Sequence, residues 1–172
     1  MLEGDERRQE ILKLLSSHST PVNGTELAKT FGVSRQIIVQ DIALLRAANR
    51  DILSTNKGYI LHQTMENFSG VQTVICVKHS LEQTMEEMQI ILDYGGSMLD
   101  VSIDHDLYGH IRADLVINSV ADATEFCNKM KQSTSKPLKV LTDDCHYHTI
   151  TAPSDKALQM ILSELKEKQF LL

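Results

Sequence analysis

The sequence predicts an α+β protein with two domains, and three observations support this prediction. Residues 1–63 contain three short stretches of helical apolar spacing followed by a hairpin pattern. Residues 70–172 instead alternate β-branched, strand-like segments with helical ones, which is typical of a mixed sheet covered by helices. The net charge changes from slightly positive to strongly negative near the same position in the chain. Eight Lys and Arg oppose seven Asp and Glu over residues 1–63 (net +1), whereas nine oppose sixteen over residues 64–172 (net −7).

Composition narrows the class of protein. With 42% hydrophobic and 23% charged residues, the chain can build ordinary globular cores. No apolar run approaches the ~18–20 residues that cross a bilayer, and the residues before Glu10 hold no apolar signal segment. The chain has three cysteines and no Cys-x-x-Cys motif, which argues against a disulfide framework and a zinc ribbon. They are Cys76, Cys127 and Cys145. We therefore expect a cytoplasmic protein without membrane contact.

The first domain is predicted to begin with three helices. Apolar residues at helical spacing indicate the first helix over residues 5–17. Asn23 or Gly24 can cap the second helix, which is expected to end at Gly32, because a glycine adopts a left-handed backbone without steric cost. Ser34 caps the third helix, which is expected to end at Asn49.

A hairpin is predicted to complete this domain. Two short strands, residues 52–53 and 59–61, flank a turn that contains Asn and Gly. The spacing of Ala28, Gly32 and Ile38 lets the second and third helices cross closely over a short connection. Three helices followed by a hairpin indicate a winged helix-turn-helix.

The third helix is expected to expose side chains suited to DNA. Arg and Gln pair bidentately with guanine and adenine edges in a major groove, and a Lys at the hairpin tip can reach a phosphate or a minor groove. The candidate DNA-binding residues are Ser34, Arg35, Gln36, Gln40 and Lys57, with Arg7, Arg8, Arg46 and Arg50 as further phosphate contacts. Asp41 is expected to face away from the groove or to hold a neighbouring Arg. The alternative is a module that binds another protein.

The second domain is predicted as a ferredoxin-like α+β layer, with helices packed on one face of a mixed sheet. Residues 66–70 are the expected linker. Strands are expected over residues 71–77, 98–103, 112–117, 138–141 and 147–151, and helices over residues 80–94, 122–132 and 154–165. The first of these helices is expected to open with a capping box formed by Ser80 and Gln83.

Two histidines one residue apart indicate a metal site. If residues 145–150 form a strand, His146 and His148 point to one face with Cα atoms ~6.5 Å apart, close enough to bind one ion. His79 follows a strand and Glu87 lies in the next helix, so both are candidates for the remaining ligands. Imidazoles with a carboxylate suit Zn²⁺, Ni²⁺, Fe²⁺ or Mn²⁺ and not Ca²⁺. The alternatives are hydrogen-bonded or surface histidines, and a solvated helix face that carries Glu87.

A polar loop is expected at residues 104–110, between two strands. Its charged and aromatic side chains around a Gly suit a small polar ligand. As catalytic groups, Asp104 and His105 would form an acid–base pair, but no Ser or Cys nucleophile motif accompanies them. Cys145 beside His146 is interpreted as a buried thiol and not as a catalytic pair.

Several separate motifs occur in the order typical of one family of regulators. Residues 27–45 resemble the helix-turn-helix of biotin-repressor-type regulators, although the Gly/Arg-rich nucleotide loop of biotin ligases is absent. Over residues 5–172 the chain resembles the niacin-responsive repressors of NiaR type, which join a helix-turn-helix to a 3H domain. The motifs that carry this resemblance are Val77-Lys78-His79-Ser80, Asp104-His105-Asp106-Leu107-Tyr108-Gly109 and His146-Tyr147-His148-Thr149-Ile150.

This resemblance implies a non-enzymatic repressor of genes for NAD biosynthesis and niacin uptake. It implies a homodimer on double-stranded operator DNA, with nicotinic acid as corepressor. It also implies one divalent transition metal ion held by His79, Glu87, His146 and His148, and an effector loop that contains His105, Tyr108 and Gly109. Two alternatives stay open: a repressor whose effector is the ion itself, and a metalloenzyme fused to a DNA-binding domain, with Asp104 or Asp144 as its base.

Overall fold

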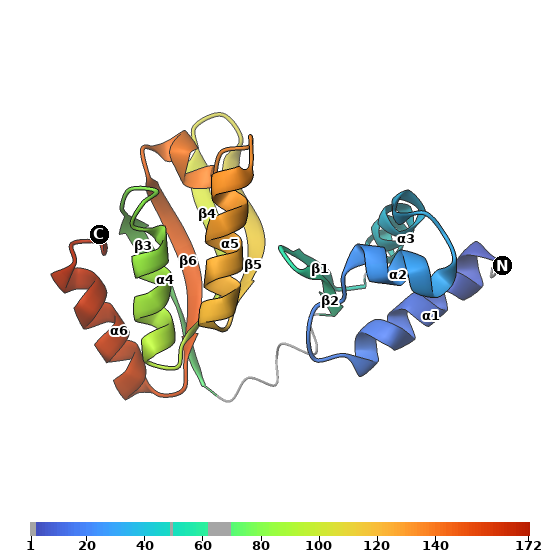
Figure 1. The fold of residues 1–172 in the computed structure, drawn as a ribbon, viewed down its shortest axis with the longest axis horizontal. Helices are drawn as coiled ribbons and strands as arrows, with labels where there is room; N and C mark the ends of the chain where they lie inside the picture. Colours follow the sequence, from blue (N-terminus) through green and yellow to red (C-terminus); the bar gives the residue numbers. More distant parts are fainter. Residues whose placement is uncertain (1–2, 49, 62–69) are drawn as a thin grey trace. The chain divides into compact units, whose positions relative to one another are not determined.

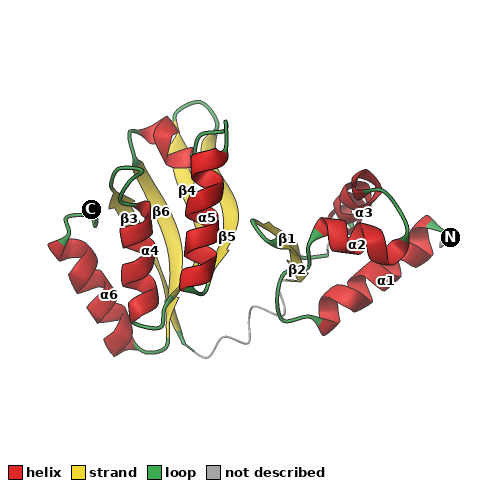
Figure 2. Ribbon diagram, in the orientation of Figure 1, coloured by secondary structure: helices red, strands yellow, loops and turns green. Residues whose placement is uncertain are grey.

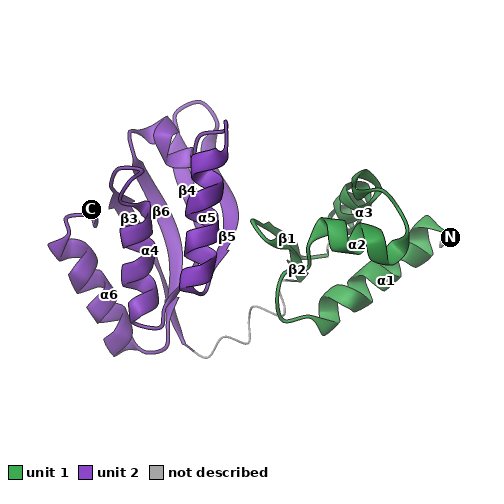
Figure 3. Ribbon diagram, viewed as in Figure 1, with its two compact units in different colours: residues 1–68 green, residues 69–172 purple. Residues whose placement is uncertain are grey.

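A computed structural model describes residues 3–48, 50–61 and 70–172 (Figure 1). The chain divides into two compact units, Met1–Phe68 and Ser69–Leu172 (Figure 3). Asn49 and residues 66–69 of the expected linker lie outside the described residues. Within the part of the chain that is described, no helix has both the length and the apolar character needed to cross a bilayer.

The first unit contains the three helices and the hairpin that the sequence predicts. The elements are α1 (Gly4–Ser17), α2 (Gly24–Phe31), α3 (Arg35–Ala47), β1 (Ile52–Thr55) and β2 (Gly58–Leu61). Two predicted caps are present: the Asn23 side chain accepts a hydrogen bond from the backbone of Thr25, and the Ser34 hydroxyl accepts one from the backbone of Ile37. Gly32 ends α2 with a φ of 64°.

One apolar core joins these helices to the hairpin. Its fully buried side chains include Ile11, Leu15, Leu27 and Ile38. The hairpin is also bound to the segment before α2, because Val22 and Tyr59 exchange two backbone hydrogen bonds of 2.8 Å. This close approach requires Gly58, since a Cβ at that position would lie 2.1 Å from the carbonyl oxygen of Val22.

The second unit is a four-stranded antiparallel sheet with helices on one face (Figure 2). Its elements are β3 (Val71–Lys78), α4 (Thr84–Asp93), β4 (Ser97–His105), β5 (Gly109–Ile117), α5 (Val120–Gln132), the 3₁₀ helix η2 (Leu138–Thr142), β6 (Cys145–Ala152) and α6 (Asp155–Glu167). Their order confirms the α+β class. Burial of Ile75, Met88, Ile150 and Ile161 shows that the core lies between the sheet and its helices.

The strand order of this sheet is β3-β6-β4-β5. A ferredoxin-like sheet has the first and third strands of its βαββαβ unit in the centre. Here the second and fourth strands, β4 and β6, are central, so the domain shares the element sequence of that fold but not its strand order. As a result β6, with two predicted metal ligands, lies directly beside β3, the strand that leads to His79.

Residues 138–141 form η2 and not the predicted strand. Pro137 precedes the segment and has no N–H to donate to a sheet. Its carbonyl instead accepts a hydrogen bond from the backbone of Val140 at 3.2 Å. The chain then turns at Asp143, which has a φ of 52°. The side chain of Lys139 is buried in the interior, which a solvent-facing position in an alternating strand would not allow.

Helix α4 begins later than predicted. The expected contact is present, because Oε1 of Gln83 accepts a hydrogen bond from the backbone of Ser80 at 3.0 Å. It closes a turn, however, and the helix begins at Thr84. The turn leaves Ser80 outside the helix, so its carbonyl oxygen is free to accept hydrogen bonds from neighbouring side chains.

Candidate metal, effector and DNA-binding sites

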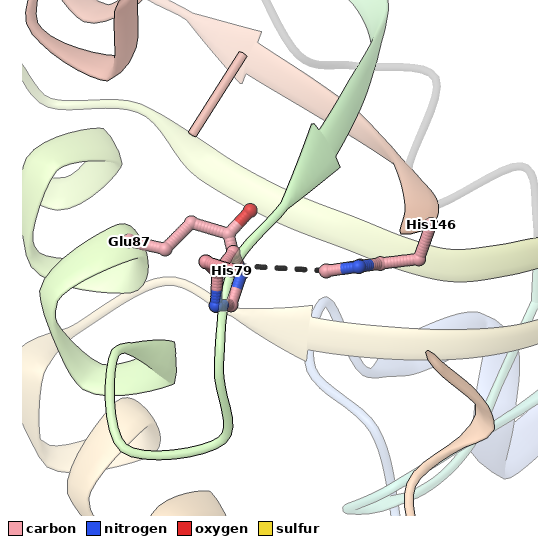
Figure 4. Close-up of side chains that lie close together, drawn as sticks. All are labelled: His79, Glu87 and His146. Atoms are coloured by element: carbon pink, nitrogen blue, oxygen red, sulfur yellow. Dashed lines mark hydrogen bonds and ion pairs between the residues drawn. The ribbon is translucent and has the colours of Figure 1, made fainter. Parts of the chain in front are cut away.

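Four predicted metal ligands meet in the second unit. His79 follows β3, Glu87 lies on α4, and His146 and His148 lie on β6. All four are buried, and Figure 4 shows the side chains of His79, Glu87 and His146 pointing toward one another. Nε2 of His79 lies 2.7 Å from Oε2 of Glu87, Nε2 of His146 lies 3.9 Å from the same oxygen, and Nε2 of His148 lies 3.5 Å from Oε1.

Backbone carbonyl oxygens orient the three imidazole rings. Nδ1 of His79 is 2.8 Å from the carbonyl oxygen of Ser80, Nδ1 of His146 is 2.8 Å from that of Asp144, and Nδ1 of His148 is 2.6 Å from that of Asp100. In His146 and His148, donation from Nδ1 to a carbonyl keeps Nε2 available as a metal ligand, whereas Nδ1 of His79 also lies 3.0 Å from the Lys139 ammonium. In each case Nε2 is the nitrogen that faces Glu87.

The electrostatics of the cluster favour an ionised Glu87. Burial opposes its charge, but the three imidazoles hold the pKa of Glu87 well below its usual range. Burial also opposes the charge of His148, yet the Glu87 carboxylate raises the pKa of His148. Burial lowers the pKa of His146, and this effect exceeds the attraction of Glu87.

These residues fit a transition metal ion. Ligand atoms of His79, Glu87 and His146 all lie within 4.8 Å of one another, and His148 faces the same carboxylate. Oε1 of Glu87 is buried and makes no hydrogen bond to any residue that the structure describes. A buried carboxylate oxygen without a partner is costly, and a cation would satisfy it. Three nitrogen donors and one carboxylate suit Zn²⁺, Ni²⁺, Fe²⁺ or Mn²⁺ rather than Ca²⁺.

The sequence did not indicate Lys139, which lies beside this cluster. Its ammonium group is buried and donates to the carbonyl oxygens of His79 (2.9 Å) and Ser80 (2.8 Å). It also lies 3.0 Å from Nδ1 of His79 and 3.3 Å from the Thr84 hydroxyl. Burial lowers the pKa of Lys139. The hydrogen bonds fix the chain around His79, so Lys139 positions a ligand and is not one itself.

Asp100 is a second residue that the sequence did not indicate. The pairing of β4 with β6 shifts between Met98 and Ser102, so Asp100 lies in an irregularity of the ladder. Its carbonyl oxygen accepts the hydrogen bond from His148, and its carboxylate accepts bonds from the N–H and the hydroxyl of Thr149 at 2.7 and 2.6 Å. A bulge beside a site is a common way to aim such groups.

A cavity of about 260 Å³ adjoins the cluster. Residues from α4, β4, β5, α5, η2 and β6 line it, so it lies within the second unit. The lining residues are Thr84, Glu87, Met88, Val101, Ala113, Leu115, Phe126, Met130, Lys136, Pro137, Leu138, Lys139, His146 and His148. An apolar cavity with a few polar groups in its lining is typical of a small-molecule site.

The predicted effector residues lie elsewhere, at the turn between β4 and β5. Tyr108 and Gly109 are exposed, and His105 is half-buried. Nδ1 of His105 accepts hydrogen bonds from the backbone of Leu107 (3.2 Å) and of Tyr108 (3.4 Å), which stabilises the turn. His105 lines a separate cavity with Asp104, Asp106, Leu141, Thr142 and Cys145. None of the three predicted effector residues lines the cavity beside the metal ligands.

The other polar groups of this region have simple local roles. Asp104 is exposed and pairs with His110 at 2.8 Å. Cys145, expected to be buried, is half-buried, and its Sγ lies 3.9 Å from Sγ of Cys76. Cys145 and His146 are consecutive residues of β6 and so point to opposite faces of the sheet, which does not favour a thiol–imidazole pair.

In the first unit, α3 exposes a polar face. Arg35, Gln36 and Gln40 are exposed, as is the capping residue Ser34, whereas Lys57 in the hairpin turn is half-buried. Exposed Arg and Gln on the third helix are placed as in helix-turn-helix readers of the major groove.

Three of the four further phosphate candidates have partners inside the protein. Asp41 is buried and forms ion pairs with Arg7 (2.6 Å) and Arg8 (3.2 Å), as expected for a carboxylate that faces away from DNA. Arg46 donates to the carbonyl oxygen of Ile52 (2.7 Å) and so connects α3 to the hairpin. Arg50 is exposed.

Comparison with known proteins gives the same division of the chain. The sequence matches an HTH domain over residues 7–60 and a 3H domain over residues 72–172. It is 38% identical over 167 residues to the probable transcription repressor NiaR of Thermotoga maritima, and the aligned region covers 97% of this chain and 94% of that protein. It is 36% identical over 172 residues to the transcription repressor NadR of Bacillus subtilis, covering 99% and 96%.

A helix-turn-helix unit joined to a 3H domain defines this protein as a DNA-binding transcription repressor and not an enzyme. The chain belongs to the NiaR-type repressor family, as the sequence motifs predicted.

Proposed function

We propose that this protein represses genes for NAD biosynthesis and niacin uptake. In this proposal nicotinic acid is the corepressor, and one divalent transition metal ion is bound in the second unit. The observation that supports it most is the buried cluster, in which Nε2 atoms of His79, His146 and His148 surround a carboxylate that lacks a hydrogen-bond partner at Oε1.

The ligand set would connect three elements of the second unit. His79 follows β3, Glu87 lies on α4, and His146 and His148 lie on β6, so a shared ion would fix these elements to one another. When bound, the ion supplies a positive charge and a coordination position for an effector atom. A ligand represses only if it binds the DNA-competent state more tightly than the other state.

The proposed binding to DNA depends on the exposed face of α3. Arg35, Gln36 and Gln40 would contact base edges, and Ser34 and Lys57 would contact the backbone. We propose a homodimer that binds two half-sites of an operator with two-fold symmetry.

A second candidate function is a repressor for which the ion itself is the signal. The geometry gives it support, because four protein ligands can complete a coordination sphere without an organic molecule. In that case DNA affinity follows metal concentration alone.

The test is the fluorescence anisotropy of promoter DNA from a niacin-uptake or NAD-biosynthesis gene. Metal-loaded protein is titrated at fixed salt, with and without nicotinic acid. Tighter binding with the acid supports the corepressor proposal. Binding that responds to metal but not to nicotinic acid contradicts it and favours the metal-sensing alternative.

A further inference from the structure

Two cysteines meet on the face of the sheet that the helices leave uncovered (Figure 2). Cys76 lies on β3 between Ile75 and Val77, which point into the core, so its own side chain points to the opposite face. Cys145 is the first residue of β6 and precedes the buried His146. Both cysteines are half-buried free thiols, and their Sγ atoms lie 3.9 Å apart. The two thiols are therefore on the other side of the sheet from the histidine cluster.

The pairing of the two strands makes these thiols diagonal neighbours. Cys76 is directly opposite Tyr147, and Cys145 is directly opposite Lys78. The Cα atoms of diagonal neighbours usually lie about 7–8 Å apart, whereas those of a disulfide lie about 4.4–6.8 Å apart. A bridging ion places two sulfur–metal bonds between the thiols where a disulfide has one sulfur–sulfur bond. The longer bridge suits the diagonal arrangement.

The separation of the two sulfur atoms fits a shared metal ion. Two zinc–sulfur bonds of about 2.3 Å at a tetrahedral angle place the sulfur atoms about 3.8 Å apart. At a trigonal angle the same bonds place them about 4.0 Å apart. The observed separation of 3.9 Å lies between these two values. One ion can therefore bind both sulfur atoms where they are.

A cavity of about 340 Å³ gives an ion access to this thiol pair. The residues that line it are Asp104, His105, Asp106, Leu141, Thr142 and Cys145. An ion held by two protein atoms needs further ligands, and the cavity has space for water molecules in that role.

The charges around the thiols favour a cation. Asp104 and Asp106 line the cavity and are exposed. The ammonium group of Lys78, the residue opposite Cys145, is paired with the carboxylate of Asp143 at 2.8 Å. The positive charge nearest the pair is thus balanced, whereas the acidic residues attract a cation to the cavity.

We propose that Cys76 and Cys145 form a second metal site, which binds one soft, thiophilic cation such as Cu⁺ or Cd²⁺. Each thiol gives its proton to solvent as its sulfur binds the ion. Thiolates select soft ions, whereas the imidazoles and the carboxylate of the histidine cluster suit Zn²⁺, Ni²⁺, Fe²⁺ or Mn²⁺. The inference goes beyond the proposed function, because neither nicotinic acid nor an ion in the histidine cluster takes part in it.

The test titrates the full-length, reduced, nickel-loaded protein with Cd²⁺ in the absence of oxygen. Nickel is added first to occupy the histidine cluster, and cadmium bound to thiolates absorbs ultraviolet light through sulfur-to-metal charge transfer. The unsubstituted protein is expected to gain this absorption up to one equivalent of Cd²⁺, and its absence would overturn the proposal. Because the absorption comes from sulfur, a histidine cluster that fails to hold nickel would leave this result unchanged.

Three variants assign the absorption to the thiol pair. Cys76→Ser and Cys145→Ser are each expected to lose it and to bind Cd²⁺ more weakly, by more than the about tenfold to hundredfold found for groups that only orient ligands. Cys127→Ser is the matched control, since Cys127 is buried in the core of the same unit, and it is expected to keep the absorption. Absorption that survives either of the first two substitutions, or that is lost in folded Cys127→Ser protein, would overturn the assignment. Thermal unfolding and nickel affinity show that each variant is folded.

A mixture of two variants tests whether both thiols come from one chain. Cys76→Ser and Cys145→Ser proteins together supply a complete pair only if two chains share an ion. The equimolar mixture is expected to show no charge-transfer absorption. Absorption at half the level of the unsubstituted protein or more would show a site between two copies of the chain and would overturn the site within one sheet.

Discussion

The carbonyl oxygen of Asp100 accepts a hydrogen bond from Nδ1 of His148 at 2.6 Å, across the irregular part of the ladder between β4 and β6. In a regular antiparallel ladder this carbonyl would pair with a backbone N–H. Here the irregular pairing directs it to an imidazole, and the Asp100 carboxylate accepts the hydrogen bond from the N–H of Thr149 instead. The same residue therefore shapes the strand and fixes the direction of a metal ligand.

This relationship predicts that Asp100→Ala weakens metal binding although Asp100 is not a ligand. Its carboxylate also binds Arg112 at 2.8 Å, so the substitution removes the acceptors that hold the bulge in place. We expect a loss of metal affinity of about tenfold to a hundredfold, the range found for groups that orient ligands. The matched control is Asp104→Ala on the same strand, whose carboxylate is exposed and pairs with His110. Equal metal affinity of the two variants in a competition titration would contradict the positioning role.

The pH dependence of metal binding follows from the protonation states of the ligands. Because burial lowers the pKa of His146, this ring is neutral at a pH where an ordinary histidine still holds its proton, and it does not compete with the metal. His148 behaves in the opposite way, because Glu87 raises its pKa and the ring keeps its proton to higher pH. Glu87 stays ionised over this range because its pKa is well below the usual value. Metal affinity should therefore rise with pH as His148 loses its proton.

Calorimetry in two buffers of different ionisation enthalpy measures this effect directly. Near neutral pH, metal binding is expected to release protons, and the number should fall as the pH rises above the range in which His148 titrates. An affinity that is constant between about pH 5.5 and 8, around the usual histidine pKa of about 6.5, would show that no imidazole of the cluster binds the metal.

Much of this architecture could be predicted from local sequence signals. Asn23, Gly32 and Ser34 mark helix ends because caps depend on neighbouring residues only, and the structure has all three. The alternation of side chains along a strand placed His146 and His148 on one face. These features depend on spacing within one element, which the sequence displays directly.

Features that depend on tertiary packing were not visible in the sequence. Lys139 alternates with apolar residues as a solvent-facing strand position would, yet its side chain is buried because the carbonyl oxygens of His79 and Ser80 accept its protons. The irregularity at Asp100 depends on how β4 meets β6, a strand about 50 residues away. Polar side chains cluster in the turn around His105 and predict a site for a small polar ligand, and only the family resemblance implies an effector loop there. The hydrogen bonds of the His105 ring in this turn are to the nearby backbone of Leu107 and Tyr108.

Lys139→Met should destabilise the second unit. The substitution removes the ammonium that donates to the carbonyl oxygen of His79, whereas the carbonyl oxygen of Ser80 keeps Nδ1 of His79 as a donor. A buried group left unsatisfied costs about 1–3 kcal/mol, and we expect the free energy of unfolding to fall by roughly that amount in metal-free protein. The matched control is Lys136→Met, an exposed position where a change within about 0.5 kcal/mol is expected. Urea unfolding measures the free energy of unfolding of both variants. Equal values would show that the Lys139 hydrogen bonds make no net contribution to stability.

Arg35→Ala should weaken binding to operator DNA. Arg35 is exposed at the start of α3, directly before Gln36 and five residues before Gln40, so its guanidinium can enter a major groove. Loss of a bidentate base contact costs about 1–3 kcal/mol of affinity and relaxes the preference for one base pair. Loss of a phosphate contact instead weakens all sequences alike and reduces the slope of affinity against salt by about one charge.

Anisotropy titrations of operator and unrelated DNA at several salt concentrations distinguish these two roles of Arg35. Lys13→Ala is the control, since Lys13 lies on α1 and pairs with Glu10 on the same helix. If Arg35→Ala binds operator DNA as tightly as Lys13→Ala, Arg35 contacts neither a base nor a phosphate, and the assignment of Arg35 to the DNA interface is wrong.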